Sequence, residues 1–174
     1  MTTNVENPIG LFSADDERFM RHAIGLAKKA SDLGEVPVGA VIVFNGQIIG
    51  EGWNLREKNK SALEHAEIMA IKEASVKSEA WRLSGVKLYV TLEPCLMCAG
   101  AIYQSRIPEV IFGALDPKAG ACGSLYKIHE DTRLNHRFLV QNGLLAEECG
   151  ELLKAFFRKR RLSSSTTDSN GENS

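Results

Sequence analysis

Residues 89–100 read Tyr89-Val-Thr-Leu-Glu-Pro94-Cys95-Leu-Met-Cys98-Ala-Gly100, and they predict a short strand that runs directly into a helix. The β-branched and apolar residues favour a strand, and the two cysteines then fall in the first turn of the helix. Side chains three positions apart share one face of a helix, so Cys95 and Cys98 can point at one spot. The positive end of the helix favours thiolate over thiol at both positions.

A second motif, His65-Ala-Glu67, precedes this stretch and completes a possible metal-binding set. Zinc binds thiolate sulfur and imidazole nitrogen, and three protein ligands with one open position are typical of a catalytic zinc site. We therefore expect His65, Cys95 and Cys98 to hold a metal, with Glu67 beside the open position as a proton carrier. Residues two apart point in nearly opposite directions on a regular helix, so this requires His65 to stand at the very start of a helix.

The Cys-x-x-Cys motif by itself leaves other interpretations open. At a helix start after a strand it is also the thioredoxin-like arrangement, which would indicate a thiol-disulfide oxidoreductase. A structural metal site would need a fourth protein ligand, and Cys122 and Cys149 are the candidates. The additional His-x-Glu motif favours catalytic zinc over both, and we expect Cys122 and Cys149 to be packing thiols.

Composition indicates an ordinary globular chain. Its 174 residues are 44% hydrophobic and 25% charged, which suffices for one domain with a core. The formal net charge of −1 provides no global positive field, so nucleic-acid binding would depend on a local basic patch. No apolar run has the length of a membrane span, and the N-terminus lacks a signal-peptide pattern. We expect no membrane partner and a cytoplasmic location.

Periodicity and turn signals predict an α/β fold with three α/β/α layers, in which helices flank a mixed five-stranded sheet. A capping box at Ser13 starts the first helix, and Asn45-Gly46 forms a hairpin turn. Helices are predicted at 14–33, 66–74, 95–105 and 147–161, and strands at 38–44, 47–53, 87–91, 109–112 and 138–141. The domain spans 13–161, after an irregular lead-in at 1–12 and before a polar tail at 162–174 that we expect to be disordered.

His-x-Glu followed by Pro-Cys-x-x-Cys resembles the signature of zinc nucleobase deaminases. Over residues 13–161 the chain resembles the bacterial tRNA-specific adenosine deaminases of the zinc-dependent cytidine and deoxycytidylate deaminase superfamily. Other matching stretches are 35–41, 52–54, 135–137 and 156–158. The resemblance implies a cytidine-deaminase-like fold, one zinc ion per chain and a homodimer. The implied reaction is hydrolytic deamination of adenosine to inosine, with release of ammonia, at the wobble position of a tRNA anticodon, that of the arginine tRNA.

The same resemblance assigns substrate contacts. Asn54 would touch the flipped base, and Arg56 would lie near the flanking backbone. Other nucleotides of the anticodon stem-loop would meet Asp116 and Lys118 in a loop, and Phe157 and Arg158 on the last helix, where cations beside aromatics suit single-stranded RNA.

Several alternatives stay open. Deaminases of free bases or nucleosides, such as guanine or cytosine, share the metal-binding motifs, and a non-catalytic module that binds zinc and RNA is a further possibility. The basic residues after Phe157 have another explanation, because cations near a helix C-terminus stabilise the helix whether or not RNA binds. Structural or solvated roles are the default for His129 and His136.

Overall fold

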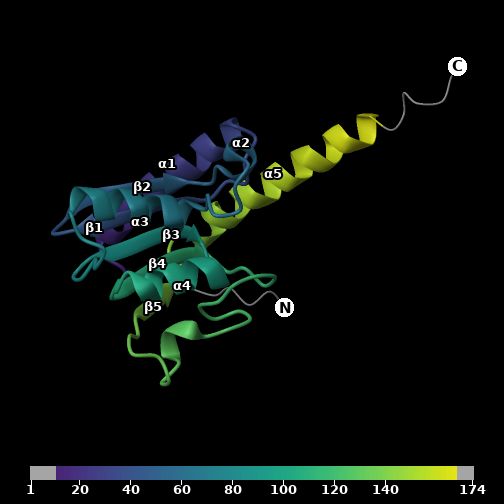
Figure 1. Ribbon diagram of the computed structural model, residues 1–174. Coiled ribbons are helices and arrows are strands. Elements are labelled where there is room, and N and C mark those ends of the chain that lie inside the picture. Colours follow the sequence, from purple (N-terminus) through teal and green to yellow (C-terminus); the bar gives the residue numbers. More distant parts are fainter. Residues whose placement is uncertain (1–10, 168–174) are drawn as a thin grey trace, which may run out of the picture.

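The structure is a computed structural model that describes residues 11–167, with side chains through Ser163. In chain order the elements are α1 (Ala14–Asp32), β1 (Gly39–Phe44), β2 (Gln47–Trp53), α2 (Arg56–Asn59), α3 (Ala66–Lys77), β3 (Lys87–Leu92), α4 (Leu96–Gln104), β4 (Glu109–Ala114), the 3-10 turn η1 (Ile128–Glu130), β5 (Leu139–Asn142) and α5 (Ala146–Thr167) (Figure 1).

The five strands form one mixed sheet in the order β2-β1-β3-β4-β5. β1 pairs antiparallel with β2 and with β3, whereas β3 to β4 and β4 to β5 are parallel pairs. Parallel neighbours need a crossover, which α4 supplies between β3 and β4. The predicted mixed five-stranded sheet is confirmed.

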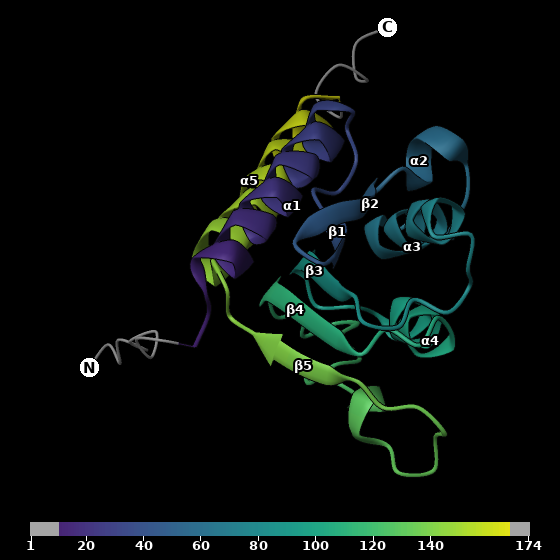
Figure 2. The ribbon, with the colours of Figure 1, turned by 90° about the vertical axis from the view of Figure 1, so that its left-hand side faces the viewer.

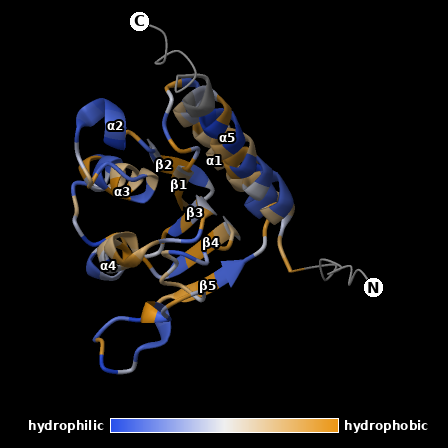
Figure 3. Cartoon of the chain, turned by 90° about the vertical axis from the view of Figure 1, so that its right-hand side faces the viewer, coloured by the Kyte–Doolittle hydropathy of each residue, from blue (hydrophilic) through white to orange (hydrophobic). Residues whose placement is uncertain are grey.

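Helices cover both faces of the sheet. Figure 2 shows α1 and α5 side by side on one face, with α3 and α4 on the other. Each helix layer encloses its own cluster of buried apolar side chains against the sheet, and β1 contributes Ile42 to one cluster and Val41 to the other. Apolar residues dominate the inner strands, and α2 and much of α5 are hydrophilic, whereas α4 is largely apolar (Figure 3). The predicted three-layer α/β/α architecture is therefore confirmed.

The predicted start of α1 is also confirmed. The Ser13 side chain accepts a hydrogen bond from the backbone N–H of Asp16 at 3.1 Å, and the Asp16 carboxylate accepts one from the Ser13 N–H at 2.8 Å. The Tyr89 hydroxyl donates to the same carboxylate at 2.7 Å, which ties the helix start to the central strand β3. The capping residue Asp16 thus also connects the helix layer to the sheet.

The predicted end of the last helix was wrong. α5 continues to Thr167, so residues 162–167 belong to the helix and not to a disordered tail. The serines and threonines there have modest helix propensity, but they extend a helix that is already nucleated, and each added residue costs little. The expectations for residues 1–10 and 168–174 lie outside the described residues. The sequence interpretation also missed α2 and η1, which are single short turns.

Candidate metal centre

His65 and Cys95 occupy equivalent places in the fold, because each is the residue that immediately precedes a helix. His65 has φ −80° and ψ 152° before α3, and Cys95 has φ −76° and ψ 176° before α4. Both backbones are extended there, so the side chains escape the helical spacing that would otherwise separate His65 from Glu67. The predicted position of His65 at a helix start is confirmed.

Close packing of α3 on the sheet brings its first residues to the site. A Cβ atom at Gly52 in β2 would lie 2.0 Å from the backbone oxygen of Ala66, which no side chain could tolerate. Glycine at this position lets the start of α3 rest directly on the strand. The position of His65 therefore depends on a missing side chain in another element.

The three predicted ligands lie together. His65 Nδ1 is 3.6 Å from Cys95 Sγ and 3.5 Å from Cys98 Sγ, and all three atoms lie within 4.8 Å of one another. Zinc–sulfur bonds of about 2.3 Å and zinc–nitrogen bonds of about 2.1 Å, at tetrahedral angles, require nitrogen–sulfur separations of about 3.6 Å. The donor atoms thus have the spacing of one face of a tetrahedral site.

The pairing of the two cysteines favours ionisation of one of them. A hydrogen bond from the Cys98 thiol, together with one from His65, lowers the pKa of Cys95 to about 4 although the residue is half-buried. The same contact with Cys95 and burial raise the pKa of Cys98. The arrangement favours the thiolate form of Cys95, and binding of a cation would drive off the proton of Cys98.

Glu67 lies beside this cluster and is almost entirely buried, with 4% of its surface exposed. Burial raises the pKa of Glu67 to about 7, and attraction to His65 only partly opposes this effect. A carboxyl group that titrates near neutral pH can both accept and donate a proton there, which is the property that general acid–base catalysis requires.

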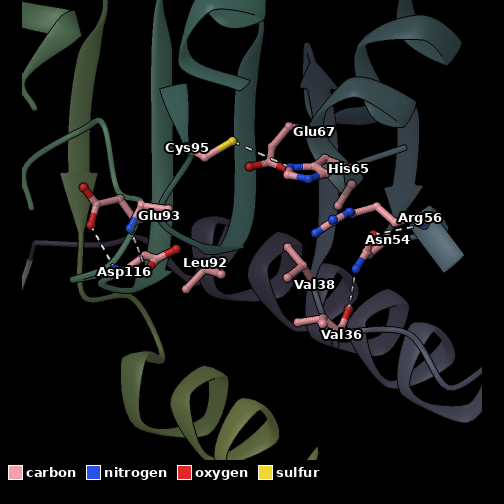
Figure 4. A pocket seen from close by; sticks show the side chains of 12 residues that line it. Val36, Val38, Asn54, Arg56, His65, Glu67, Leu92, Glu93, Cys95 and Asp116 are labelled. Carbon is pink, nitrogen blue, oxygen red and sulfur yellow. Dashed lines mark hydrogen bonds between the residues drawn. The ribbon is translucent and has the colours of Figure 1, made fainter. Parts of the chain in front are cut away.

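A cavity of about 210 Å³ opens beside the cluster (Figure 4). His65, Glu67 and Cys95 are among the residues that line it. Asn54 and Arg56 stand on one side and Asp116 on the other, as Figure 4 shows. This volume is below the range of about 300–1,000 Å³ that is typical of pockets for drug-sized ligands. The cavity therefore suits a small planar group such as a single base.

The predicted substrate residues divide into two groups. Asn54, Arg56 and Asp116 line the cavity. Lys118 is exposed in the adjoining loop, where its backbone N–H donates to Asp116 at 3.0 Å. Phe157 and Arg158 do not line the cavity but are exposed on α5, which extends well past the body of the molecule (Figure 1).

Asn54 is held rigidly for a residue at the mouth of a cavity. Its side-chain nitrogen donates to the backbone oxygen of Val36 at 3.3 Å, and its side-chain oxygen accepts from the backbone N–H of Arg56 at 3.3 Å. Only 6% of its surface is exposed. These two hydrogen bonds fix the orientation of the amide, with its nitrogen toward Val36 and its oxygen toward Arg56.

Comparison with known proteins identifies the family. The family model of the MafB19-like deaminases matches residues 14–161. The tRNA-specific adenosine deaminase of Bacillus subtilis is 52% identical over 146 residues, which cover 84% of this chain and 91% of that protein. This chain belongs to the tRNA-specific adenosine deaminase family.

Solved structures agree with this assignment. A structure from work on A-to-I editing by tRNA:A34 deaminases at the wobble position of transfer RNA superposes with a TM-score of 0.76. It is 40% identical and covers 78% of this chain and 99% of its own. The guanine deaminase of Bacillus subtilis is 38% identical with a TM-score of 0.57, over 62% of this chain and 69% of its own. The expected cytidine-deaminase-like fold is thus confirmed, and the chain is an enzyme.

The other cysteines of this deaminase lie outside the cluster. Cys122 and Cys149 are 3% and 1% exposed, and neither belongs to the metal-ligand group found among the described residues. Burial raises the pKa of each thiol to about 12, so both stay neutral. Their prediction as packing thiols agrees with this placement.

The two loop histidines of this deaminase have structural contacts. His136 Nε2 lies 3.0 Å from the backbone oxygen of Ile107, and the ring of His129 packs against Phe138. Burial lowers the pKa of His129, so the ring is neutral at pH 7. Both residues fit the default structural role.

Two buried carboxylates of this deaminase were missed at the sequence level. Glu35, with 1% of its surface exposed, accepts hydrogen bonds from the backbone N–H groups of Glu57 and Lys58 at 3.2 and 2.7 Å. It thereby anchors α2, which follows directly after Asn54. Glu93 has an equivalent role on the opposite wall. The available signal in the sequence was an acidic residue next to apolar, strand-forming residues. A carboxylate buried there needs hydrogen-bond partners, because it is seldom buried without them.

Proposed function

We propose that this enzyme hydrolyses adenosine to inosine at the wobble position of a tRNA anticodon, with one zinc ion held by His65, Cys95 and Cys98. The single observation that carries this proposal is the buried Glu67 beside three tetrahedrally spaced ligand atoms, in the lining of a cavity that suits one base. When bound there, zinc would lower the pKa of water to about 7 and so make hydroxide available at neutral pH.

Glu67 would move the protons of the reaction. It would take a proton from the attacking water and pass it to the ring nitrogen next to C6 of adenine. It would then take the remaining proton from the hydroxyl group added at C6 and give it to the exocyclic amine, so that the C–N bond breaks and the C6 carbonyl forms. Water and adenosine thus yield inosine and ammonia, and one carboxyl group suffices because the transfers are sequential.

The residues on the cavity walls would select and orient the base. Asn54 would form hydrogen bonds to its edge, since the amide is already fixed by Val36 and Arg56. Arg56 would meet the adjoining phosphate, and Asp116 and Lys118 would contact neighbouring nucleotides. An unpaired anticodon base can be flipped into the cavity without opening a duplex, which lowers the cost of binding.

The names of the relatives and the basic residues 158–161 of α5 support RNA as the substrate. Phe157 is 43% exposed and is followed by Arg158, Lys159, Arg160 and Arg161. Because these residues lie outside the cavity, they would bind nucleotides of the stem-loop at a distance from the flipped base. The arginine tRNA, the homodimer and the cytoplasmic location stay predictions; no described helix is long and apolar enough to cross a membrane.

A substrate comparison tests the proposal. Purified enzyme is incubated with an anticodon stem-loop that carries adenosine at the wobble position, with the same stem-loop in which this adenosine is moved by one nucleotide, and with free adenosine, guanine and cytidine. Mass spectrometry for inosine and an ammonia assay should detect product from the first substrate alone. Guanine is the alternative substrate that the similarity to a guanine deaminase favours; faster release of ammonia from any free base than from the stem-loop would contradict the proposal.

A further inference from the structure

Glu93 lies between strand β3 and the Pro94-Cys95 pair, with 2% of its surface exposed. A carboxylate in such a place must be compensated by hydrogen bonds or a positive charge. Its partners therefore indicate what it does. All of the hydrogen bonds described for this carboxylate come from one loop, residues 116–124.

Four donors of this loop converge on Glu93. The backbone N–H groups of Asp116, Cys122 and Ser124 donate to its oxygens at 3.0, 3.1 and 2.8 Å, and the Ser124 hydroxyl donates as well. Each oxygen of the buried carboxylate thus accepts hydrogen bonds, and every donor belongs to this loop.

The loop also fits closely around the carboxylate. A Cβ atom at Gly120 would lie 2.3 Å from the Oε2 atom of Glu93, so only glycine permits the approach. The same stretch runs along the metal-site segment, where the backbone N–H of Ala121 donates to the oxygen of Pro94 at 2.8 Å and Gly120 forms a bridge with Cys95.

This loop forms one wall of the cavity. Asp116 and Ala119 both line it, opposite Asn54 and Arg56. In Figure 4, Glu93 and Asp116 are joined by a dashed line on one side of the cavity, whereas Glu67 and His65 lie together at a distance from them. The Glu93 carboxylate is thus engaged with the loop rather than with the reacting centre.

We propose that Glu93 is a positioning residue, which holds the 116–124 loop as the wall that receives the nucleotides beside the target base. The loop carries its own polar residues toward the cavity, but the position of its backbone is set by the buried anion. Without that anion, at least three backbone N–H groups lose their partner, and unmade buried hydrogen bonds are costly. The wall would then open, while the metal ligands and Glu67 stay in place.

Two substitutions test the contact from opposite sides. Glu93→Gln replaces one acceptor oxygen by an NH₂ group that faces N–H donors. Ser124→Ala removes one donor on the loop side, the Ser124 hydroxyl, and leaves Glu93 and the neighbours of Cys95 unchanged. Glu73→Gln is the matched control. Its carboxylate also accepts a backbone N–H of another element, that of Glu51 at 2.8 Å, but it does not line this cavity.

Hydrogen exchange of the holoenzyme is followed by mass spectrometry for peptides that cover residues 115–126, together with zinc content. We expect faster exchange in these peptides for Glu93→Gln, a smaller increase for Ser124→Ala and none for Glu73→Gln, with one zinc per chain in all three. Unchanged exchange in both Glu93→Gln and Ser124→Ala would overturn the proposal. The proposal would also be overturned if Glu93→Gln lost its zinc while Ser124→Ala showed unchanged hydrogen exchange, because Glu93 would then act on Cys95 and not on the loop.

The kinetic arm rests on the proposed function. On the anticodon stem-loop, we expect Glu93→Gln to raise KM by about 10-fold or more, with kcat changed much less, because substrate placement and not proton transfer is lost. A fall in kcat at constant KM would contradict a positioning role. Should the wild type deaminate only a free base, the proposed function fails, but hydrogen exchange still decides whether Glu93 holds the loop. If Glu93→Gln does not fold, hydrogen exchange and kinetics of Ser124→Ala test the proposal instead.

Discussion

The metal-ligand cluster and the outer part of α5 are built in opposite ways. His65 and Cys95 each begin a helix that packs on the sheet, and Cys98 is completely buried. Phe157 and Arg158 are exposed on α5. Bond making needs atoms placed within a few tenths of an ångström, whereas attraction to phosphate acts over several ångströms. The buried cluster thus suits bond making, and the exposed part of α5 suits contact with phosphate groups.

The largest expected effect comes from the cluster itself. Cys98→Ser replaces a thiolate ligand by a hydroxyl group, which is a poor ligand for zinc. Zinc content measured by inductively coupled plasma mass spectrometry should fall well below one per chain, and activity should fall to background. Cys149→Ser, another buried cysteine on the opposite face of the sheet, should keep its zinc. Full zinc occupancy in Cys98→Ser would refute the assigned ligand set.

The next effect separates proton transfer from metal binding. Glu67→Gln keeps the shape of the side chain but cannot carry a proton. Turnover of the stem-loop should fall by about 10²–10⁴-fold while the zinc content stays at one per chain. Glu64→Gln, a carboxylate outside the cavity, should leave turnover unchanged. Near-normal turnover by Glu67→Gln would show that another group moves the protons.

A smaller effect is expected at the cavity wall. Asn54→Ala removes the proposed contact with the base and leaves Val36 O and Arg56 N–H without their side-chain partner. We expect kcat/KM for the stem-loop to fall by about 10- to 100-fold, the equivalent of one or two lost buried hydrogen bonds. Steady-state kinetics measures this directly. An unchanged kcat/KM would mean that Asn54 serves only to shape the loop.

The smallest effect should arise on α5. Arg158→Ala combined with Lys159→Ala removes two exposed cations, so KM for a stem-loop should rise a few-fold at low salt while kcat stays constant. The dependence of log KM on log salt should lose a slope of about 0.7 for each phosphate contact removed. Lys77→Ala removes a cation that pairs with Glu73 at the end of α3 and serves as the control. Equal salt slopes for all variants would leave α5 without a role in RNA binding.

The elements that the sequence predicted well are those with local causes. The Ser13 capping box, the Asn45-Gly46 turn and the apolar run of β1 each act through neighbours in the chain, and all are present in the structure. The end of α5 was predicted wrongly because polar composition resembles a disordered tail, whereas an existing helix lowers the cost of adding residues.

The sequence by itself determined the chemistry of the site: a nitrogen donor, two sulfur donors and a nearby carboxyl group, with His65 required to precede a helix. The tertiary structure alone decided which of these groups is buried, how the cavity is shaped, and that Glu35 and Glu93 hold its two walls. The physical reason is that a sequence motif relates only residues that are close together in the chain. Burial, a pKa near 7 at Glu67 and the hydrogen bonds to Glu93 depend on segments about 20–30 residues away that only folding brings together.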